Sequence, residues 1–152
     1  MEDHRLKRFE FSLNKLMGYK QQVLDREKND LAHLRRQQQQ YIDEKRALEE
    51  ALKRSNREFL EKSAAGMTIM QVTTFKGYHK SLSSQIKELE ASIEKMEERV
   101  QRQLNVVIEA TKEVSSLEKL EDKQLEEYNF KVAKAEEQFI EEYVTNASYR
   151  AV

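Results

Sequence analysis

Apolar residues recur along this chain at alternating steps of four and three, which is the spacing of a coiled-coil heptad. From residue 13 to residue 59, nine of the fourteen positions on that spacing are apolar, namely Leu13, Met17, Leu24, Leu31, Leu34, Tyr41, Leu48, Leu52 and Phe59. A denser stripe runs from residue 72 to residue 117 and comprises Val72, Phe75, Leu82, Ile86, Leu89, Ile93, Met96, Val100, Val107, Ala110, Val114 and Leu117. Only His79 and Gln103 interrupt this second stripe. The pattern predicts two long helices that supercoil around each other.

One cluster of helix-breaking signals separates the two stripes, at residues 63–66 with the sequence Ser-Ala-Ala-Gly. Thr68 and Gln71 then form a capping-box pattern, and Met67 and Val72 stand where a hydrophobic staple would join. We therefore expect an all-α fold, a single antiparallel coiled-coil hairpin over residues 1–152. Helix one is expected at about 10–62, the turn at 63–67, and an extended C-terminal helix two at about 68–148.

A chain that folds back at residues 63–67 brings together residues whose numbers add to about 130. The two stripes meet in that register, with Phe59 facing Val72 and Leu34 facing Met96. The polar interruptions partly coincide as well, because Glu27 falls opposite Gln103. A parallel homodimer is the alternative, and it would leave the turn without a purpose.

This register leaves helix two longer than its partner. The pairing of helix one is expected to run out near Leu13, opposite Leu117, so about thirty residues, or about 45 Å, of helix two extend beyond it. The spacing from Leu117 through Glu121 to Leu125 predicts a stutter there. Apolar residues continue along this overhang, at Leu125, Tyr128, Phe130, Val132, Phe139, Ile140, Tyr143 and Val144. Helix one adds a second stripe at Leu16, Tyr19 and Val23, and exposed apolar stripes of this kind indicate a protein partner.

Composition narrows the class of protein. Charged residues make up 36% of the chain, the mean hydropathy is −0.89, and the chain has no Pro and no Cys, all of which favour long helices over a compact globule. The net charge of −1 gives no reason to expect a nucleic-acid partner. No apolar run approaches the ~20 residues that cross a bilayer, so we expect no membrane insertion and a cytoplasmic protein.

The sequence offers no catalytic constellation. It contains no glycine-rich phosphate-binding motif, and none of His4, His33 and His79 has a second metal ligand four residues on. A two-helix hairpin also lacks a concave pocket for a substrate. We therefore expect no catalytic residues, no metal, no cofactor and no enzymatic activity. The residue pattern alone leaves three roles open: a spacer, a chaperone that holds another helix, or an axle inside a ring.

Residues 9–17, 117–128 and 136–142 together resemble the FliJ family of bacterial flagellar type III export proteins. Residues 9–17, FEFSLNKLM, resemble the family's F-x-F-x-L-x-x-L-L opening. Residues 117–128, LEKLEDKQLEEY, are similar to its L-E-K-L-x-x-K-x-L-x-E-Y segment. Residues 136–142, EEQFIEE, resemble its E-Q-K-x-x-D-E ending, although Phe139 stands where Lys is common. The order and spacing of the three segments cover nearly the whole chain.

The resemblance implies a stalk similar to the central stalk of rotary ATPases. The open end of the hairpin would enter the hexameric export ATPase, a FliI-like protein, and promote its assembly and activity. Carried onto this sequence, the ring contacts would be Phe9, Phe11, Leu13, Leu16, Phe130, Phe139 and Tyr143. Because Phe9 and Phe11 are two residues apart, they cannot both face one helical stripe, so we expect at least one of them to be free.

The same resemblance implies a contact with an export-gate protein, which is FlhA-like. On this sequence that contact would fall around Leu48, Leu52, Tyr78 and Leu82, and Tyr78 is the best candidate for exposure because it lies beside the seam. Export chaperones are a further implied partner, and the location would be the cytoplasmic face of the inner-membrane export apparatus. The alternatives are a chaperone escort, a structural tether, or the equivalent stalk of an injectisome.

Overall fold

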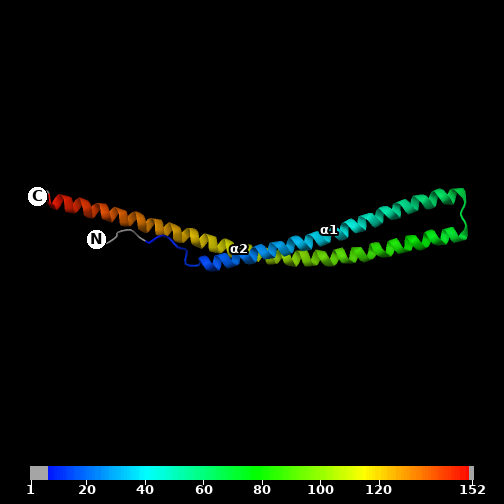
Figure 1. Cartoon of the computed structure of the whole chain (residues 1–152), viewed down its shortest axis with the longest axis horizontal. Helices are drawn as coiled ribbons and strands as arrows, with labels where there is room; N and C mark the ends of the chain where they lie inside the picture. The colour runs from blue at the N-terminus through cyan, green and yellow to red at the C-terminus, as the bar shows by residue number, and fades with distance from the viewer. Residues whose placement is uncertain (1–6, 151–152) are drawn as a thin grey trace. The chain divides into compact units, whose positions relative to one another are not determined.

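Two antiparallel helices make up the fold. The computed structural model describes residues 7–150, with α1 at Asn14–Ala65 and α2 at Ile69–Arg150 (Figure 1). The all-α, two-helix antiparallel prediction is confirmed. Contacts between the helices divide the chain into two units. We name residues 26–108 the turn unit, and residues 7–25 together with 109–150 the terminal unit.

The helix bounds differ from the expected ones mainly in α1. The helix was expected at about 10–62, but it begins at Asn14 and ends at Ala65. The expected start of helix two at about 68 lies one residue from its observed start at Ile69, and α2 continues to Arg150. The connection therefore spans only residues 66–68, a shorter turn than the expected 63–67.

Backbone chemistry specifies this turn. Gly66 has a φ of 103°, a conformation that residues with a Cβ rarely adopt, and its amide donates to the Ser63 carbonyl at 3.3 Å. The predicted capping box is confirmed: the Gln71 amide donates to the Thr68 hydroxyl at 3.2 Å, and the Thr68 amide donates to Gln71 Oε1 at 3.0 Å. These bonds satisfy amides that the first turn of α2 would otherwise leave unpaired.

In the turn unit, two contacts between the helices join residues whose numbers add to four or five more than expected. The rings of Phe59 and Phe75 lie 5.7 Å apart between centroids, and Lys45 Nζ lies 3.5 Å from Glu90. These residue numbers add to 134 and 135 instead of about 130, and Phe59 packs on Phe75 where Val72 was expected, whereas Glu27 and Gln103 keep the expected sum of 130. The physical reason is that α1 continues to Ala65, which moves the centre of the turn two residues later along the chain.

Polar residues that interrupt the seam pair with each other. Gln103 Nε2 donates to Glu27 Oε2 at 2.6 Å and to the Glu27 carbonyl at 3.0 Å, which confirms their predicted proximity. His79 Nε2 and Ser55 Oγ share a hydrogen bond of 2.8 Å, and Ser55 is buried. Hydrogen bonding offsets the cost of burying these groups. A polar pair inside a coiled-coil seam also disfavours other registers, which would leave one partner unsatisfied.

The seam side chains that are most deeply buried come from both helices. In the turn unit they are Leu31, Leu82, Ile86, Met96, Val100 and Val107. In the terminal unit they are Met17, Leu24 and Val114, and Phe11 of the segment before α1 is buried as well. Burial of each such side chain contributes roughly 1.5–3 kcal/mol to stability.

The seam of α2 does not change its phase where we expected a stutter. After Val114 the half-buried positions include Leu117, Glu121, Gln124 and Tyr128, which continue the four-three spacing of the seam, whereas Leu125 is exposed. The predicted step from Glu121 to Leu125 is therefore wrong. Ser12 Oγ donates to Gln124 Oε1 at 3.4 Å, so a polar contact with the N-terminal segment holds this position instead of an apolar one.

We predict that Gly66→Ala lowers the free energy of unfolding by about 1–2 kcal/mol, because Ala would be strained at a positive φ. Gly77→Ala is the matched control: Gly77 is helical, a Cβ there meets nothing within 4 Å, and we expect about 0.5–1 kcal/mol of stabilisation. Urea titration followed by circular dichroism measures both changes. Equal effects of the two substitutions would contradict this account of the turn.

Candidate interaction surfaces

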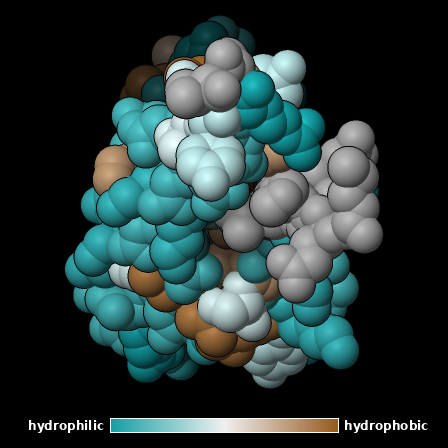
Figure 2. Space-filling model, turned by 90° about the vertical axis from the view of Figure 1, so that its left-hand side faces the viewer, coloured by the Kyte–Doolittle hydropathy of each residue, from teal (hydrophilic) through white to brown (hydrophobic). Residues whose placement is uncertain are grey.

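Large apolar side chains are exposed along α2 in the terminal unit. Every residue from Glu136 to Arg150 is exposed. The exposed fractions of Phe130 and Tyr143 are both 69%, and Phe139 is 48% exposed. Ile140 and Val144 are exposed as well. Figure 2 looks onto the end of the molecule where α2 finishes and shows apolar patches within a mainly hydrophilic surface.

The N-terminal segment that precedes α1 packs against α2 without being helical. The ring of Phe9 lies 5.5 Å from the ring of Tyr128, and Phe11 is only 7% exposed. The expectation that at least one of these two aromatics would be free assumed a helix, and it is wrong. Because the segment is not helical, Phe9 can contact Tyr128 of α2 while Phe11 is buried as well.

Hydrogen bonds hold this segment in place. The Tyr128 hydroxyl donates to the Lys7 carbonyl at 2.6 Å, and the Asn14 amide donates to the Phe11 carbonyl at 3.1 Å as α1 begins. Sequence reasoning missed the role of Tyr128, which it placed among the apolar residues of the overhang. The Tyr that ends the LEKLEDKQLEEY segment was the available signal, because this segment and residues 9–17, which contain Phe9 and Phe11, both resemble family motifs.

At the start of α1, part of the apolar surface is accessible. Leu13 and Leu16 are 36% and 42% exposed, and Tyr19 of the predicted second stripe is 58% exposed. Beside them, Lys20 Nζ lies 2.8 Å from Glu113. The hydrogen bond and the charge of Glu113 raise the pKa of Lys20 above the 10.5 of a free lysine. This pair therefore favours the folded state at neutral pH, and the contribution is lost only as the pH rises through the raised pKa.

The four residues proposed for the gate lie in the turn unit, but they do not form one exposed patch. Tyr78 is 49% exposed, as its position beside the seam predicted. Leu82 is 4% exposed and belongs to the buried seam, so it offers no surface to a partner. Leu48 and Leu52 are half-buried.

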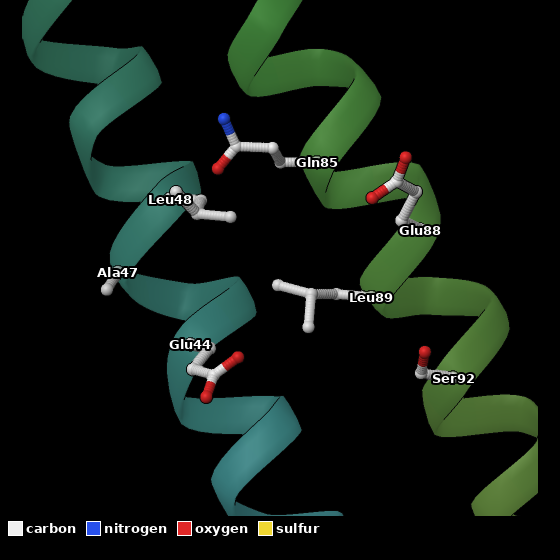
Figure 3. A pocket seen from close by; sticks show the side chains of 7 residues that line it. All are labelled: Glu44, Ala47, Leu48, Gln85, Glu88, Leu89 and Ser92. Atoms are coloured by element: carbon white, nitrogen blue, oxygen red, sulfur yellow. The ribbon is translucent and has the colours of Figure 1, made fainter.

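Leu48 also lines a shallow groove between the two helices. Figure 3 shows Leu48 of α1 and Leu89 of α2 pointing toward each other into this groove. Its polar rim includes Glu44, Gln85 and Glu88. An apolar floor with carboxylates at the rim suits a side chain of a protein partner.

Residues 7–150 present no group of three or more His, Cys, Asp or Glu side chains arranged to hold a metal ion. His79 bonds Ser55, and His4 lies outside the described residues. Within the same residues, neither helix has a stretch apolar enough to span a bilayer.

These features define a class of protein: a coiled-coil hairpin whose accessible surfaces suit protein partners. The family model of the flagellar FliJ protein matches residues 9–152, nearly the whole chain. The chain therefore belongs to the FliJ family, and it is a non-catalytic component of the flagellar export apparatus. No curated protein and no solved structure gave a significant match.

We predict that Phe11→Ala releases the N-terminal segment, because it removes a buried ring from the contact with α2. Trypsin should then cleave after Arg8 and Lys15 on the order of tenfold faster, since cleavage tracks the population of the opened segment. Leu16→Ala, at a more exposed neighbouring site, should change the rate little. If both variants were cleaved at the wild-type rate, the packing of this segment would be refuted.

Proposed function

We propose that this chain is the stalk of the flagellar export ATPase. In this proposal the terminal unit enters the hexameric, FliI-like ring, promotes its assembly and activity, and couples it to the export gate. The observation that carries the proposal is the row of exposed apolar side chains on α2 beyond Tyr128, which includes Phe130 and Tyr143. A helix with such side chains is stabilised when a surrounding partner covers them.

The residues proposed for the ring contribute unequally. Phe130 and Tyr143 are the principal contacts, because most of their surface is accessible. Leu13, Leu16 and Phe139 offer less surface, and Phe9 is half-buried against Tyr128. Phe11 acts indirectly, since its burial holds the N-terminal segment against α2 and thereby sets the width of the part that enters the ring.

The gate contact is proposed for the turn unit. Tyr78 provides the accessible aromatic ring for an FlhA-like partner, and Leu48 provides part of the floor of the neighbouring groove. Leu52 supports this surface from its half-buried position, and Leu82 supports it from within the seam. The stalk would work at the cytoplasmic face of the inner membrane, where the gate and the ATPase meet.

A second candidate role is the escort of export chaperones. The observation that favours it is the accessible stripe at the start of α1, where Leu16 and Tyr19 are exposed beside a half-buried Val23. A helix of a chaperone could pack along this stripe. Tyr19→Ala would then weaken co-purification with the cognate chaperones and leave stimulation of the ATPase intact.

The stalk proposal predicts that the purified chain stimulates ATP hydrolysis and hexamer formation by its cognate export ATPase, saturating at one chain per hexamer. Phe130→Ala with Tyr143→Ala should raise the concentration for half-maximal stimulation on the order of tenfold or more, as expected for aromatic contact residues. Leu60→Ala is the control, because Leu60 is 68% exposed but lies in the turn unit. Wild-type stimulation by the double variant, with unchanged helicity, would count against the stalk.

The gate proposal predicts different effects for substitutions at Tyr78 and at Leu82. We expect Tyr78→Ala to weaken binding of the gate protein's cytoplasmic domain, measured by calorimetry, with little change in the melting temperature. Leu82→Ala should lower the free energy of unfolding by about 2–5 kcal/mol, because it leaves a cavity in the seam. If Tyr78→Ala bound the gate domain as tightly as wild type, the gate contact would have to lie elsewhere.

A further inference from the structure

Charges along α2 are segregated in a way that the net charge of −1 conceals. From its start at Ile69 to Glu88, α2 carries three lysines and no other charged residue before Glu88. Between Lys134 and Arg150 it carries four glutamates and no basic residue. The first stretch lies in the turn unit and the second in the terminal unit. Each stretch is therefore a local concentration of one sign of charge in a chain that is otherwise of mixed charge.

The basic stretch presents its charges on one face of α2. Ile69, Lys76, Lys80 and Lys87 are separated by seven, four and seven residues, so they fall within about 40° around the helix. All four side chains are exposed, and Ile69 is 87% exposed. We call these four residues the basic face.

The acidic stretch has a corresponding arrangement. Phe130, Glu137, Ile140, Glu141 and Val144 lie within about 100° around α2, and all five are exposed. The apolar members are 69%, 60% and 55% exposed, in chain order. We call these five residues the acidic face.

The charges of both faces lack ion-pair partners within the described chain. The ion pairs among residues 7–150 join Lys20, Lys45 and Lys112 to glutamates that lie outside the two faces. The three lysines of the basic face and the two glutamates of the acidic face are therefore exposed and form no direct ion pair among the described residues.

The two faces also match in spacing. Lys76 and Lys80 follow Ile69 by seven and eleven residues, and Glu137 and Glu141 follow Phe130 by the same seven and eleven. When the two segments of α2 are placed side by side and parallel, Ile69 meets Phe130, Lys76 meets Glu137, and Lys80 meets Glu141. One alignment therefore satisfies an apolar pair and two ion pairs together.

We propose that two copies of this chain associate through these faces, the basic face of one copy packing in parallel against the acidic face of another. The occupant is a second copy, because both halves of the complementary surface are present on the same chain. The contact joins two different surfaces, so each copy keeps one face free after pairing, and further copies add at either end.

This association belongs to the free chain and goes beyond the proposed stalk function. The acidic face includes Phe130, which is also proposed to contact the ATPase ring, so a chain held in the ring could not present that face to another copy. Its test uses the purified chain without the ATPase. Failure of the association would leave the stalk proposal standing, and failure of the stalk would leave the association standing.

The experiment measures molar mass by sedimentation equilibrium over a range of protein and salt concentrations. For the wild-type chain we expect species larger than a dimer that increase with protein concentration. Raising the salt from 50 mM to 500 mM should weaken the association on the order of tenfold, because both ion pairs are exposed to solvent. A monomer at every concentration, or a species insensitive to salt, would overturn the proposal.

Two double variants remove one face each. Lys76→Gln with Lys80→Gln should give a monomer with an intact acidic face, and Glu137→Gln with Glu141→Gln should give a monomer with an intact basic face. An equimolar mixture of the two should form dimers and nothing larger, because only one intact face remains on each chain. This stoichiometry distinguishes contact between two unlike faces from a symmetric dimer.

Matched controls keep the same spacing and chemistry elsewhere on α2. Glu94→Gln with Glu98→Gln, and Lys119→Gln with Lys123→Gln, replace exposed residues outside both faces. Both should associate like the wild-type chain, and circular dichroism should show unchanged helicity in every variant. The proposal is refuted if a control variant becomes monomeric to the same degree as the face variants, or if the mixture of face variants stays monomeric.

Discussion

The short turn between α1 and α2 is the constraint from which the interhelical contacts follow. A heptad seam repeats, so the same apolar stripes can be matched in several registers that differ by about one step of the repeat. The positive φ of Gly66 and the capping box of Thr68 and Gln71 hold the connection to residues 66–68. That length selects the register in which Phe59 packs on Phe75. The paired polar groups, His79 with Ser55 and Gln103 with Glu27, are satisfied in the same arrangement.

The terminal unit obeys a different constraint, because α1 begins only at Asn14, after the two aromatic residues of the N-terminal segment. In a helix, Phe9 and Phe11 would point away from each other, and only one could contact α2. The non-helical segment allows both to do so, with Tyr128 as the shared partner of Phe9 and of the Lys7 carbonyl. The family's opening motif thus has a structural meaning in this chain: it attaches the N-terminal segment to the helix whose continuation is exposed.

Buried and exposed residues of α2 have different roles. Buried residues such as Leu82, Met96 and Val100 hold the two helices together, and their replacement affects stability before it affects any partner. Accessible residues such as Tyr78, Phe130 and Tyr143 contribute little to that packing and are available for recognition. The basic and acidic faces lie on separate stretches of one helix, so the charge of the exposed surface changes sign along α2.

Heptad spacing, the absence of proline and the signals at residues 63–71 were sufficient to predict two antiparallel helices, the capping box and the proximity of Glu27 to Gln103. These features are local or periodic, so short stretches of sequence encode them. The register, the continuous seam through Gln124 and the burial of Phe11 were not predictable in the same way. Each depends on which residues of a distant segment lie opposite, and a repeating pattern admits several such matches. The heptad phase did predict one division among the candidate contact residues: Leu82 lies in the stripe and is buried, whereas Tyr78 lies beside it and is exposed.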